Sequence, residues 1–235
     1  MGKKNAVWIT GASSGIGKSL SIKFAENNFN VIASARRIKS IQQTITENNF
    51  TSEFIPLQND VSNYADLTKK INELQENYHI SCLINNAGIT SFKPFVENTK
   101  EEIDQIINVN LLGSIYTTQI VLPEMIKNNN GTIINILSVA AKTVFTNSSI
   151  YASSKAGLDY FAKVLREEVR SHHIRILNVF PGATSTEIWP KESLNKFSDK
   201  MMKPESLADL IFDVYKTDPS LSPEELVVRP ITGDL

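Results

Sequence analysis

A tyrosine and a lysine, Tyr151 and Lys155, stand four residues apart in the sequence Y-A-S-S-K. If this segment is helical, the two side chains lie on one side of the helix, one turn apart. A phenol has a pKa near ~10 and exchanges protons poorly at neutral pH, but a neighbouring ammonium lowers that pKa. The pair is therefore a candidate general acid–base. The alternative is a tyrosine packed at a helix end above a solvated lysine, because this spacing is common by itself.

A glycine-rich turn, Thr10–Gly17, follows the first apolar run and precedes a helical pattern. Its three glycines allow a tight turn and let a diphosphate approach the helix N-terminus, where backbone N–H groups favour anions. The spacing is G-x-x-x-G-x-G and not the more common G-x-G-x-x-G. We expect six residues of this turn to contact a dinucleotide cofactor: Gly11, Ser13, Ser14, Gly15, Ile16 and Gly17.

A nucleoside triphosphatase is one alternative, because Gly17-Lys18-Ser19 resembles the end of a phosphate-binding loop. That loop needs a glycine at the position of Ala12. Moreover, no later strand ends in an obvious magnesium-binding aspartate followed by a catalytic glutamate. The turn therefore favours a dinucleotide.

The residues after the second apolar run indicate which dinucleotide is bound. An acidic side chain there bonds the ribose 2′-hydroxyl of NAD, whereas arginine suits the 2′-phosphate of NADP. Ala35 occupies the acidic position, and Arg36 and Arg37 follow it. The sequence therefore predicts NADP(H) in preference to NAD(H), although two arginines could also begin a solvated helix.

Small and polar residues also follow the later apolar runs. Asp60 and Val61 follow the third run, where an aspartate either bonds an adenine edge or caps a helix. The other candidate cofactor contacts are Asn86, Ala87 and Gly88 after the fourth run, and Pro181, Gly182, Thr184 and Thr186 after the sixth. The carboxyl ends of parallel strands form the ligand crevice of an open sheet, so these residues are expected to meet there.

Two more polar side chains are candidates for the reacting end of the site. Asn110 shares a helical stripe with Ile103 and Ile107, and a buried asparagine is costly unless it is hydrogen-bonded. We expect it to organise a polar network or a water. Ser138 closes the fifth run, where it either caps the next turn or bonds a substrate carbonyl.

The elements that must position these residues alternate along the chain. Seven short apolar runs are mostly continuous, as is typical of parallel strands covered on both faces. They are Ala6–Ile9, Val31–Ala33, Phe54–Leu57, Cys82–Ile84, Ile133–Leu137, Ile174–Phe180 and Leu226–Val228. Segments with helical periodicity separate them. The pattern predicts an α/β protein with a doubly wound parallel sheet and helices on both faces, as one domain over residues 1–235.

Composition excludes several classes of protein. The chain has 235 residues, 41% of them hydrophobic, and a net charge of −1, which argues against nucleic-acid or membrane-surface binding. No apolar run approaches the roughly 20 residues of a membrane span, so we expect no membrane partner. A single cysteine, Cys82, fits a reducing, cytoplasmic location. The three histidines suggest no metal site.

Taken together, these motifs resemble those of the short-chain dehydrogenase/reductase family, in order and spacing over nearly the whole chain. The matching positions are Thr10–Gly17, Asp60-Val61, Asn85–Gly88, Asn110, Ser138, Tyr151 with Lys155, Pro181-Gly182 and Thr186. The resemblance implies a Rossmann-type fold and hydride transfer between a nicotinamide and a carbonyl or alcohol.

The resemblance also implies a role for each catalytic candidate. Tyr151 would protonate the carbonyl oxygen during reduction, and Lys155 would lower the pKa of Tyr151 and bond the nicotinamide ribose. Ser138 would orient the substrate oxygen, and Asn110 would hold a water that links Lys155 to solvent. Thr186 would bond the carboxamide.

The segment 187–203 is expected to form a lid over the nicotinamide. Its apolar residues, with Val144 and Phe145, suggest a partly apolar substrate pocket; the alternative is that they only pack the lid. They are Ile188, Trp189, Phe197, Met201 and Met202. We predict a ketone or aldehyde reductase, with a 3-oxoacyl-[acyl-carrier-protein] reductase as the alternative. Asn129 and His172 stand where such a reductase would have arginines.

A non-enzymatic dinucleotide-binding regulator is a further alternative, but such proteins often lack the tyrosine or lysine that is present here. The family resemblance suggests a homodimer or homotetramer formed through the long helices, including 151–171, and the last strand.

Overall fold

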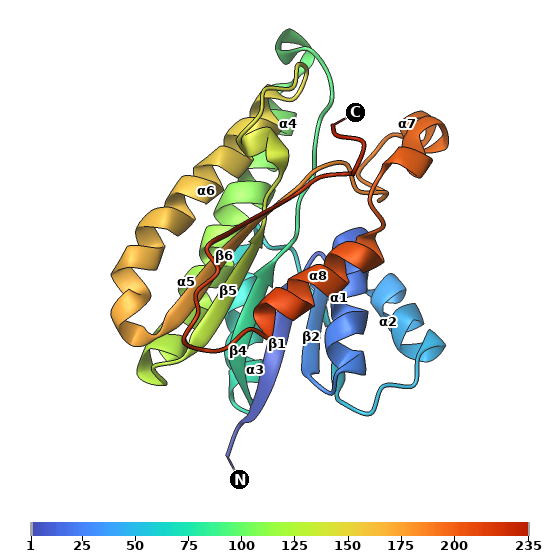
Figure 1. Ribbon diagram of the computed structural model, residues 1–235. Coiled ribbons are helices and arrows are strands. Elements are labelled where there is room, and N and C mark those ends of the chain that lie inside the picture. The colour runs from blue at the N-terminus through green and yellow to red at the C-terminus, as the bar shows by residue number, and fades with distance from the viewer. Residues whose placement is uncertain (1, 235) are drawn as a thin grey trace.

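The computed structural model describes residues 2–234 and is built around one seven-stranded parallel sheet (Figure 1). The strands are β1 (Lys4–Thr10), β2 (Asn30–Ala35), β3 (Phe54–Gln58), β4 (Tyr78–Asn85), β5 (Gly131–Ile136), β6 (Ile174–Pro181) and β7 (Glu225–Val228). Each overlaps one of the predicted apolar runs, so the predicted strands are confirmed. The largest difference in bounds is that β4 begins at Tyr78 and not at Cys82.

The strand order is β3-β2-β1-β4-β5-β6-β7. The chain builds outward from β1 to β3, crosses back to β4, and then builds outward in the other direction to β7. The order therefore reverses between β1 and β4, which confirms the predicted doubly wound sheet. In such sheets the ligand crevice lies beyond the carboxyl ends of the strands at this reversal.

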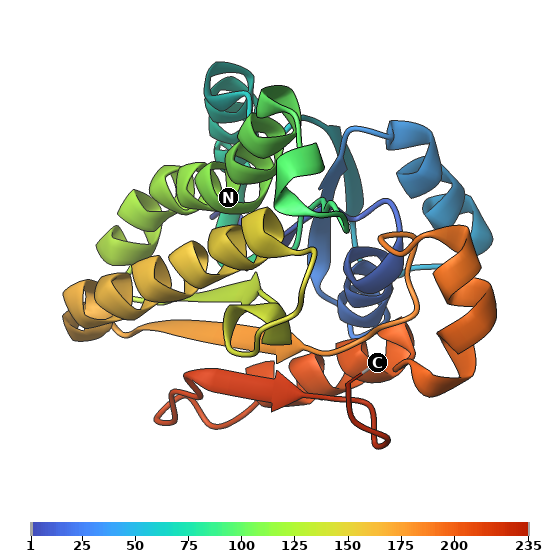
Figure 2. The same cartoon turned by 90° about the horizontal axis from the view of Figure 1, so that it is seen from above.

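Helices cover both faces of the sheet, as the view from above shows (Figure 2). The helices of the described residues are α1 (Gly15–Glu26), α2 (Ile38–Glu47), α3 (Tyr64–Gln75), α4 (Lys100–Ile107), α5 (Gly113–Lys127), α6 (Ser149–Val169), α7 (Lys191–Phe197) and α8 (Pro204–Tyr215). Side chains of α1, α2 and α8 share one buried cluster with the sheet, and those of α3, α5 and α6 share another. The sheet thus has one apolar core on each face.

Aromatic side chains anchor both cores. On the α1 face, the rings of Phe24 and Phe212 meet edge to face at 5.1 Å. On the opposite face Trp8 is fully buried, and its indole nitrogen donates to the Ser34 hydroxyl at 2.9 Å. Burial of a large apolar side chain contributes roughly 1.5–3 kcal/mol, so these rings hold the helices firmly against the strands.

The helical run Lys100–Lys127 combines α4, a π-helical turn at Asn108–Leu112, and α5. By length and composition alone this run is apolar enough to cross a membrane. Its apolar residues Val121 and Met125 are fully buried in the core beneath the sheet. Core packing therefore accounts for part of its apolar character, since 44% of its most apolar stretch is buried.

Candidate active site

A cavity of about 790 Å³ lies along the carboxyl ends of the strands. It runs from Arg36 and Asp60 beyond β2 and β3, past the start of α1, to Tyr151 and Trp189. Most of the predicted site residues line it: Gly11, Ser13, Ser14, Gly15, Ile16, Arg36, Arg37, Asp60, Val61, Asn86, Ala87, Gly88, Ser138, Tyr151, Lys155, Pro181, Gly182, Thr184 and Thr186. Gly17 and Asn110 do not line it.

The glycine-rich turn brings the backbone between β1 and α1 close to neighbouring loops. Gly11 and Gly15 have φ angles of 66° and 54°, which side chains other than glycine rarely adopt. A Cβ on Gly15 would lie 2.8 Å from a Thr186 methyl carbon. Gly17 packs against the Asn86 amide and the Gly11 carbonyl, so its role is to let the turn and β4 pack closely. Gly17 does not line the cavity, and the prediction that it contacts the ligand stays untested.

The N-terminus of α1 has the features of an anion-binding site. Within the described residues, its N-cap Ser14 makes no side-chain capping bond, and its first turn contains no acidic residue. The first N–H groups of a helix carry partial positive charge and have no partner inside the helix. A diphosphate placed here would satisfy them, so this feature fits the predicted dinucleotide.

Of the two arginines after β2, Arg37 reaches toward the glycine-rich turn. Its guanidinium donates to the hydroxyls of Ser13 at 3.4 Å and Ser14 at 3.2 Å, and to the Glu187 carboxylate at 3.0 Å. In this cluster the guanidinium and the two hydroxyl groups are donors suited to a phosphate monoester, which would compete with the Glu187 carboxylate for Arg37. Both predicted arginines line the cavity, and Arg37 is the one whose guanidinium belongs to this cluster.

Asn59 gives a further test of whether the cavity fits a dinucleotide. Its side chain lines the cavity and is 5% exposed, yet neither its amide nitrogen nor its oxygen has a partner within the described residues. Leaving a buried amide unpaired is costly, and a ligand with donor and acceptor atoms would relieve that cost. Asp60 is held differently, because the Ser62 hydroxyl and N–H both donate to its carboxylate. Burial opposes ionisation of Asp60, but these bonds outweigh it and keep its pKa below the usual value.

Tyr151, Ser138 and Lys155 lie together at the other end of the cavity. Tyr151 and Lys155 are both in the first turns of α6, one turn apart as predicted. The Lys155 ammonium donates to the Ile136 carbonyl at 2.8 Å and lies 5.9 Å from the centre of the Tyr151 ring. Ser138 caps the short turn after β5 by accepting from the N–H of Ala140 at 3.1 Å. Its hydroxyl thus caps the turn and also lines the cavity, while its bond to a substrate carbonyl stays a prediction.

The pKa values of Tyr151 and Lys155 differ from those expected for a phenol paired with a neighbouring ammonium. Burial raises the pKa of Tyr151, and its hydrogen bond with Ser138 opposes this rise. Burial also lowers the pKa of Lys155 to about 8. Desolvation acts on both groups, and the Lys155 ammonium is bonded to a backbone carbonyl, so the expected lowering of the Tyr151 pKa does not appear here.

Asn110 is fully buried in the π-helical turn between α4 and α5. Its amide nitrogen donates to the Ile89 carbonyl at 2.9 Å and the Ser154 hydroxyl at 3.0 Å, and its oxygen accepts from the Ile89 N–H at 2.9 Å. The Ser154 hydroxyl in turn donates to the Tyr151 carbonyl at 2.7 Å. Asn110 therefore organises a polar network, as predicted, and joins the loop after β4 to the start of α6. Its water-holding role stays a prediction.

Comparison with known proteins agrees with this architecture. The family model of the short chain dehydrogenase matches residues 5–196. A sepiapterin reductase of Chlorobaculum tepidum is 32% identical, over 99% of this chain and 98% of that protein. This chain belongs to the short-chain dehydrogenase family. An NADP-dependent 3-hydroxy acid dehydrogenase of Schizosaccharomyces pombe is also 32% identical, over 94% of this chain and 83% of that protein.

The structure of this short-chain dehydrogenase is also similar to solved structures. The closed form of a serine dehydrogenase complexed with NADP⁺ has a TM-score of 0.90 and 26% identity, with 98% of this chain and 96% of that chain covered. The family assignment makes the protein an oxidoreductase. The names of the relatives differ in substrate, so they leave the substrate to be inferred from the cavity.

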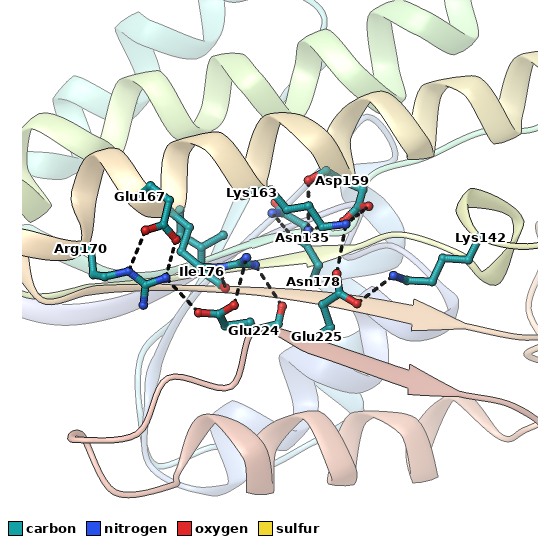
Figure 3. Close-up of polar contacts among 11 residues, drawn as sticks. Asn135, Lys142, Asp159, Lys163, Glu167, Arg170, Ile176, Asn178, Glu224 and Glu225 are labelled. Atoms are coloured by element: carbon teal, nitrogen blue, oxygen red, sulfur yellow. Dashed lines mark hydrogen bonds and ion pairs between the residues drawn. The ribbon is translucent and has the colours of Figure 1, made fainter.

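A row of buried amides lies behind the candidate active site of this dehydrogenase, and of its asparagines only Asn85 belongs to a motif that the sequence indicated. Asn85 donates to Asn135 at 3.0 Å, Asn135 to Asn178 at 2.9 Å, and Asn178 to the Asp159 carboxylate at 2.9 Å. Figure 3 shows the part of this row from β5 and β6 to Asp159 on α6. Because Asp159 lies two turns beyond Tyr151, the row fixes α6 against the strand ends. An asparagine near the end of three apolar runs was the available signal.

Ion pairs continue this row to the last strand. Lys163 pairs with Asp159 at 2.7 Å and with Glu225 at 3.2 Å, and Glu225 also pairs with Lys142 at 2.8 Å (Figure 3). Nearby, the buried Arg166 donates to the carbonyl oxygens of residues 176 and 224, at 3.1 Å each. Together these contacts hold α6, β6 and β7 as one unit.

Some of the residues predicted to form the substrate pocket line the cavity, and others do not. Ile188, Trp189, Phe197 and Phe145 line the cavity. Val144 is 94% exposed and does not line it, so its predicted place in the pocket is wrong; the backbone after the Ser138 turn directs it outward. Met201, at the end of the same segment, is buried, and the backbone of Met202 forms a β-bridge with Thr184. They are likewise absent from the cavity wall. Phe92, which lines the cavity, was missed because its loop has no periodicity.

Proposed function

We propose that this short-chain dehydrogenase is an NADP(H)-dependent oxidoreductase that reduces a ketone or aldehyde, or oxidises the corresponding alcohol. The observation that carries the proposal is one cavity with two chemically different ends. An uncapped helix and an arginine–serine cluster suit a phosphorylated dinucleotide at one end, and Tyr151, Ser138 and Lys155 meet at the other. The NADP-bound relative of known structure supports the cofactor assignment.

The dinucleotide would be held along the wall of the cavity by residues of this chain. Arg36, Arg37, Ser13 and Ser14 would bind the 2′-phosphate, and the α1 N-terminus would bind the diphosphate. The Asn59 amide and the Asp60-Val61 segment would recognise the adenine. Lys155 would bond the nicotinamide ribose, and Thr184 and Thr186 would bond the carboxamide. When bound, the nicotinamide supplies or accepts the hydride.

The catalytic residues handle the proton and the charge on oxygen. Ser138 and Tyr151 would both donate hydrogen bonds to the substrate oxygen, where negative charge builds during reduction. Because burial raises the pKa of Tyr151, its phenol is protonated at neutral pH, which is the form that donates a proton. Lys155 has three N–H donors and uses one on Ile136, so donors remain for the cavity. The covering segment 187–203 would exclude water.

The direct test is to measure NADPH oxidation with a panel of ketones and aldehydes, including a β-ketoacyl thioester for the acyl-carrier-protein alternative. The proposal expects turnover of at least one carbonyl that is slower with NADH. Tight NADPH binding with no turnover across the panel would favour the regulatory alternative.

Cofactor choice can be tested by binding. The double variant Arg36→Ala/Arg37→Ala is expected to weaken NADPH binding by at least about 10- to 100-fold, because even one hydrogen bond to a charged group contributes roughly 1.5–3 kcal/mol. NADH binding should change little. The control is Lys39→Ala, which removes an exposed cation outside the cavity. Titration of both cofactors by fluorescence or calorimetry gives the ratio, and an unchanged NADPH-to-NADH ratio would contradict the assignment.

We also propose that the protein forms a homodimer or homotetramer. Tyr160 and Val164 are 72% and 48% exposed on α6, and Val227 is 48% exposed on the edge strand β7. Exposed apolar side chains on a long helix and on a sheet edge are typical of surfaces between subunits. The single-domain organisation and the cytoplasmic location stay predictions.

A further inference from the structure

An aromatic wall joins two loops above the catalytic tyrosine. The rings of Phe92 and Trp189 are stacked, with centroids 5.1 Å apart and planes 13° apart. Phe92 also lies 6.5 Å from the Tyr151 ring. Phe92 belongs to the loop after β4 and Trp189 to the segment after β6, so the stack links both sides of the cavity.

The wall is fixed in place on one side and open to a ligand on the other. The Trp189 indole nitrogen donates to the Thr184 carbonyl at 3.0 Å, which sets the orientation of its ring. Phe92 remains 41% exposed and lines the cavity. An exposed aromatic ring beside a cavity is a stacking surface, because flat rings prefer offset contact with one another. Phe145, Ile188 and Phe197 add apolar surface at the same end.

Positive charge is scarce at this end. Among the cavity-lining residues within 2–234, Lys155 is the only cation other than Arg36 and Arg37, which lie at the opposite end beside the glycine-rich turn. The Lys155 ammonium is bonded to the Ile136 carbonyl. Arg229 lies behind Gly182, but its guanidinium bonds the Asp234 carboxylate at 3.2 Å and the Thr143 hydroxyl at 2.8 Å. Apart from Lys155, whose remaining donors are assigned to the cofactor ribose, no cation among the cavity-lining residues within 2–234 lies at this end to pair with a substrate carboxylate.

We propose that the substrate carries an uncharged, flat and largely apolar group next to its carbonyl, which stacks on the Phe92–Trp189 wall, and carries no carboxylate. This inference rests on the proposed function. A carboxylate buried beside the aromatic wall would lose its hydration without gaining a cation of its own, because the one cation at this end, Lys155, is assigned to the cofactor ribose, and such burial is unfavourable. The protein thus differs in substrate class from the relatives that are named for serine and for a 3-hydroxy acid.

The charge part of the inference is tested with two matched pairs of ketones and NADPH. Methyl acetoacetate is compared with acetoacetate, and methyl 4-acetylbenzoate with 4-acetylbenzoate. Within each pair the ester is expected to have a kcat/KM at least about a hundredfold higher, because the wall offers the carboxylate no partner. Equal or better reduction of either carboxylate would overturn the inference while leaving the proposed function intact. If no ketone or aldehyde is reduced at all, the proposed function fails and this inference falls with it.

The aromatic part is tested by the ratio of kcat/KM for acetophenone to that for cyclohexyl methyl ketone, which differ mainly in flatness. Phe92→Leu keeps an apolar side chain but removes the stacking face, so the ratio should fall about fivefold relative to the wild type. Because the same two ketones are used with the variant and the wild type, the difference in intrinsic reactivity between the ketones cancels. Phe95→Leu, an exposed phenylalanine of the same segment outside the cavity, should leave the ratio unchanged. An unaltered ratio in Phe92→Leu, or an equal fall in both variants, would overturn the aromatic wall as a stacking surface.

Discussion

Replacing Tyr151 by phenylalanine is expected to lower kcat for carbonyl reduction by about a thousandfold or more, since positioned proton transfer contributes roughly 10²–10⁴. The phenyl ring keeps the packing beside Phe92 and the start of α6. What is lost is the hydroxyl that bonds Ser138 and donates the proton. NADPH binding should change little, because the proposed phosphate contacts lie at the other end of the cavity.

The measurement is steady-state reduction of a neutral ketone, with NADPH affinity determined separately by titration. Tyr160→Phe is the matched control: it makes the same change on α6, but at a side chain that is 72% exposed. The control should retain wild-type kcat. Comparable turnover by Tyr151→Phe and the wild type would remove Tyr151 from the mechanism, whereas equal losses in both variants would point to damage of the helix.

The direction of the Tyr151 pKa shift bears on the direction of the reaction. A phenol whose pKa is raised by burial is protonated at neutral pH, so it is ready to donate a proton in carbonyl reduction. Alcohol oxidation needs the phenolate, which forms only at higher pH. In the proposed mechanism we therefore expect reduction to proceed at neutral pH and oxidation to need alkaline solution.

Much of the fold was predictable because its signals are local. A strand covered on both faces must be apolar along its length, so the seven apolar runs reveal the seven strands. The polar and glycine residues after each run then fall at one edge of the sheet by the geometry of parallel strands. For this reason most of the predicted site residues line one cavity, although they are spread from Gly11 to Thr186.

What the sequence did not reveal depends on contacts between distant segments. The spacing of Tyr151 and Lys155 predicts their proximity, but their pKa values are set by burial, which only the packed structure shows. Gly17 has the spacing of a ligand contact, yet it packs against Asn86. Phe92 becomes part of the site only because Trp189, almost a hundred residues later, stacks on it. No local sequence pattern predicts such contacts between residues that are far apart in the chain.

Lys155 illustrates the cost of building this site. The side chain is 4% exposed, and burial lowers its pKa from 10.5 to about 8. The native state therefore loses this proton at lower pH than the unfolded chain does. Between roughly pH 8 and 10.5 the unfolded state binds more protons, so this group makes stability rise with pH across that window. Below pH 8 the protein bears the full penalty, about 3 kcal/mol by the pKa difference.

Lys155→Met should consequently lower kcat/KM for ketone reduction by about a hundredfold or more while stabilising the fold at neutral pH. Methionine fills similar space without a buried charge, but the Ile136 carbonyl loses its hydrogen bond, which costs roughly 1 kcal/mol. The expected net gain is about 1–3 kcal/mol at pH 7. The gain should shrink toward zero or below as the pH rises above about 10, where the wild-type lysine is neutral in the native state.

Denaturant unfolding of the wild type and Lys155→Met at pH 7 and pH 10 measures their difference in free energy of unfolding. Taking the difference between the two proteins at each pH cancels the contribution of the other titrating groups. The control is Lys163→Met on the same helix, whose ammonium is partly exposed and paired with Asp159 and Glu225. That variant should gain no stability at pH 7, because it removes ion pairs and not a buried unpaired charge. If Lys155→Met is instead less stable at pH 7, or if its difference from the wild type is the same at both pH values, the Lys155 ammonium is not the energetic burden that its burial indicates. A gain in stability that accompanies the loss of turnover would show that the position is kept as lysine for catalysis at the expense of the fold.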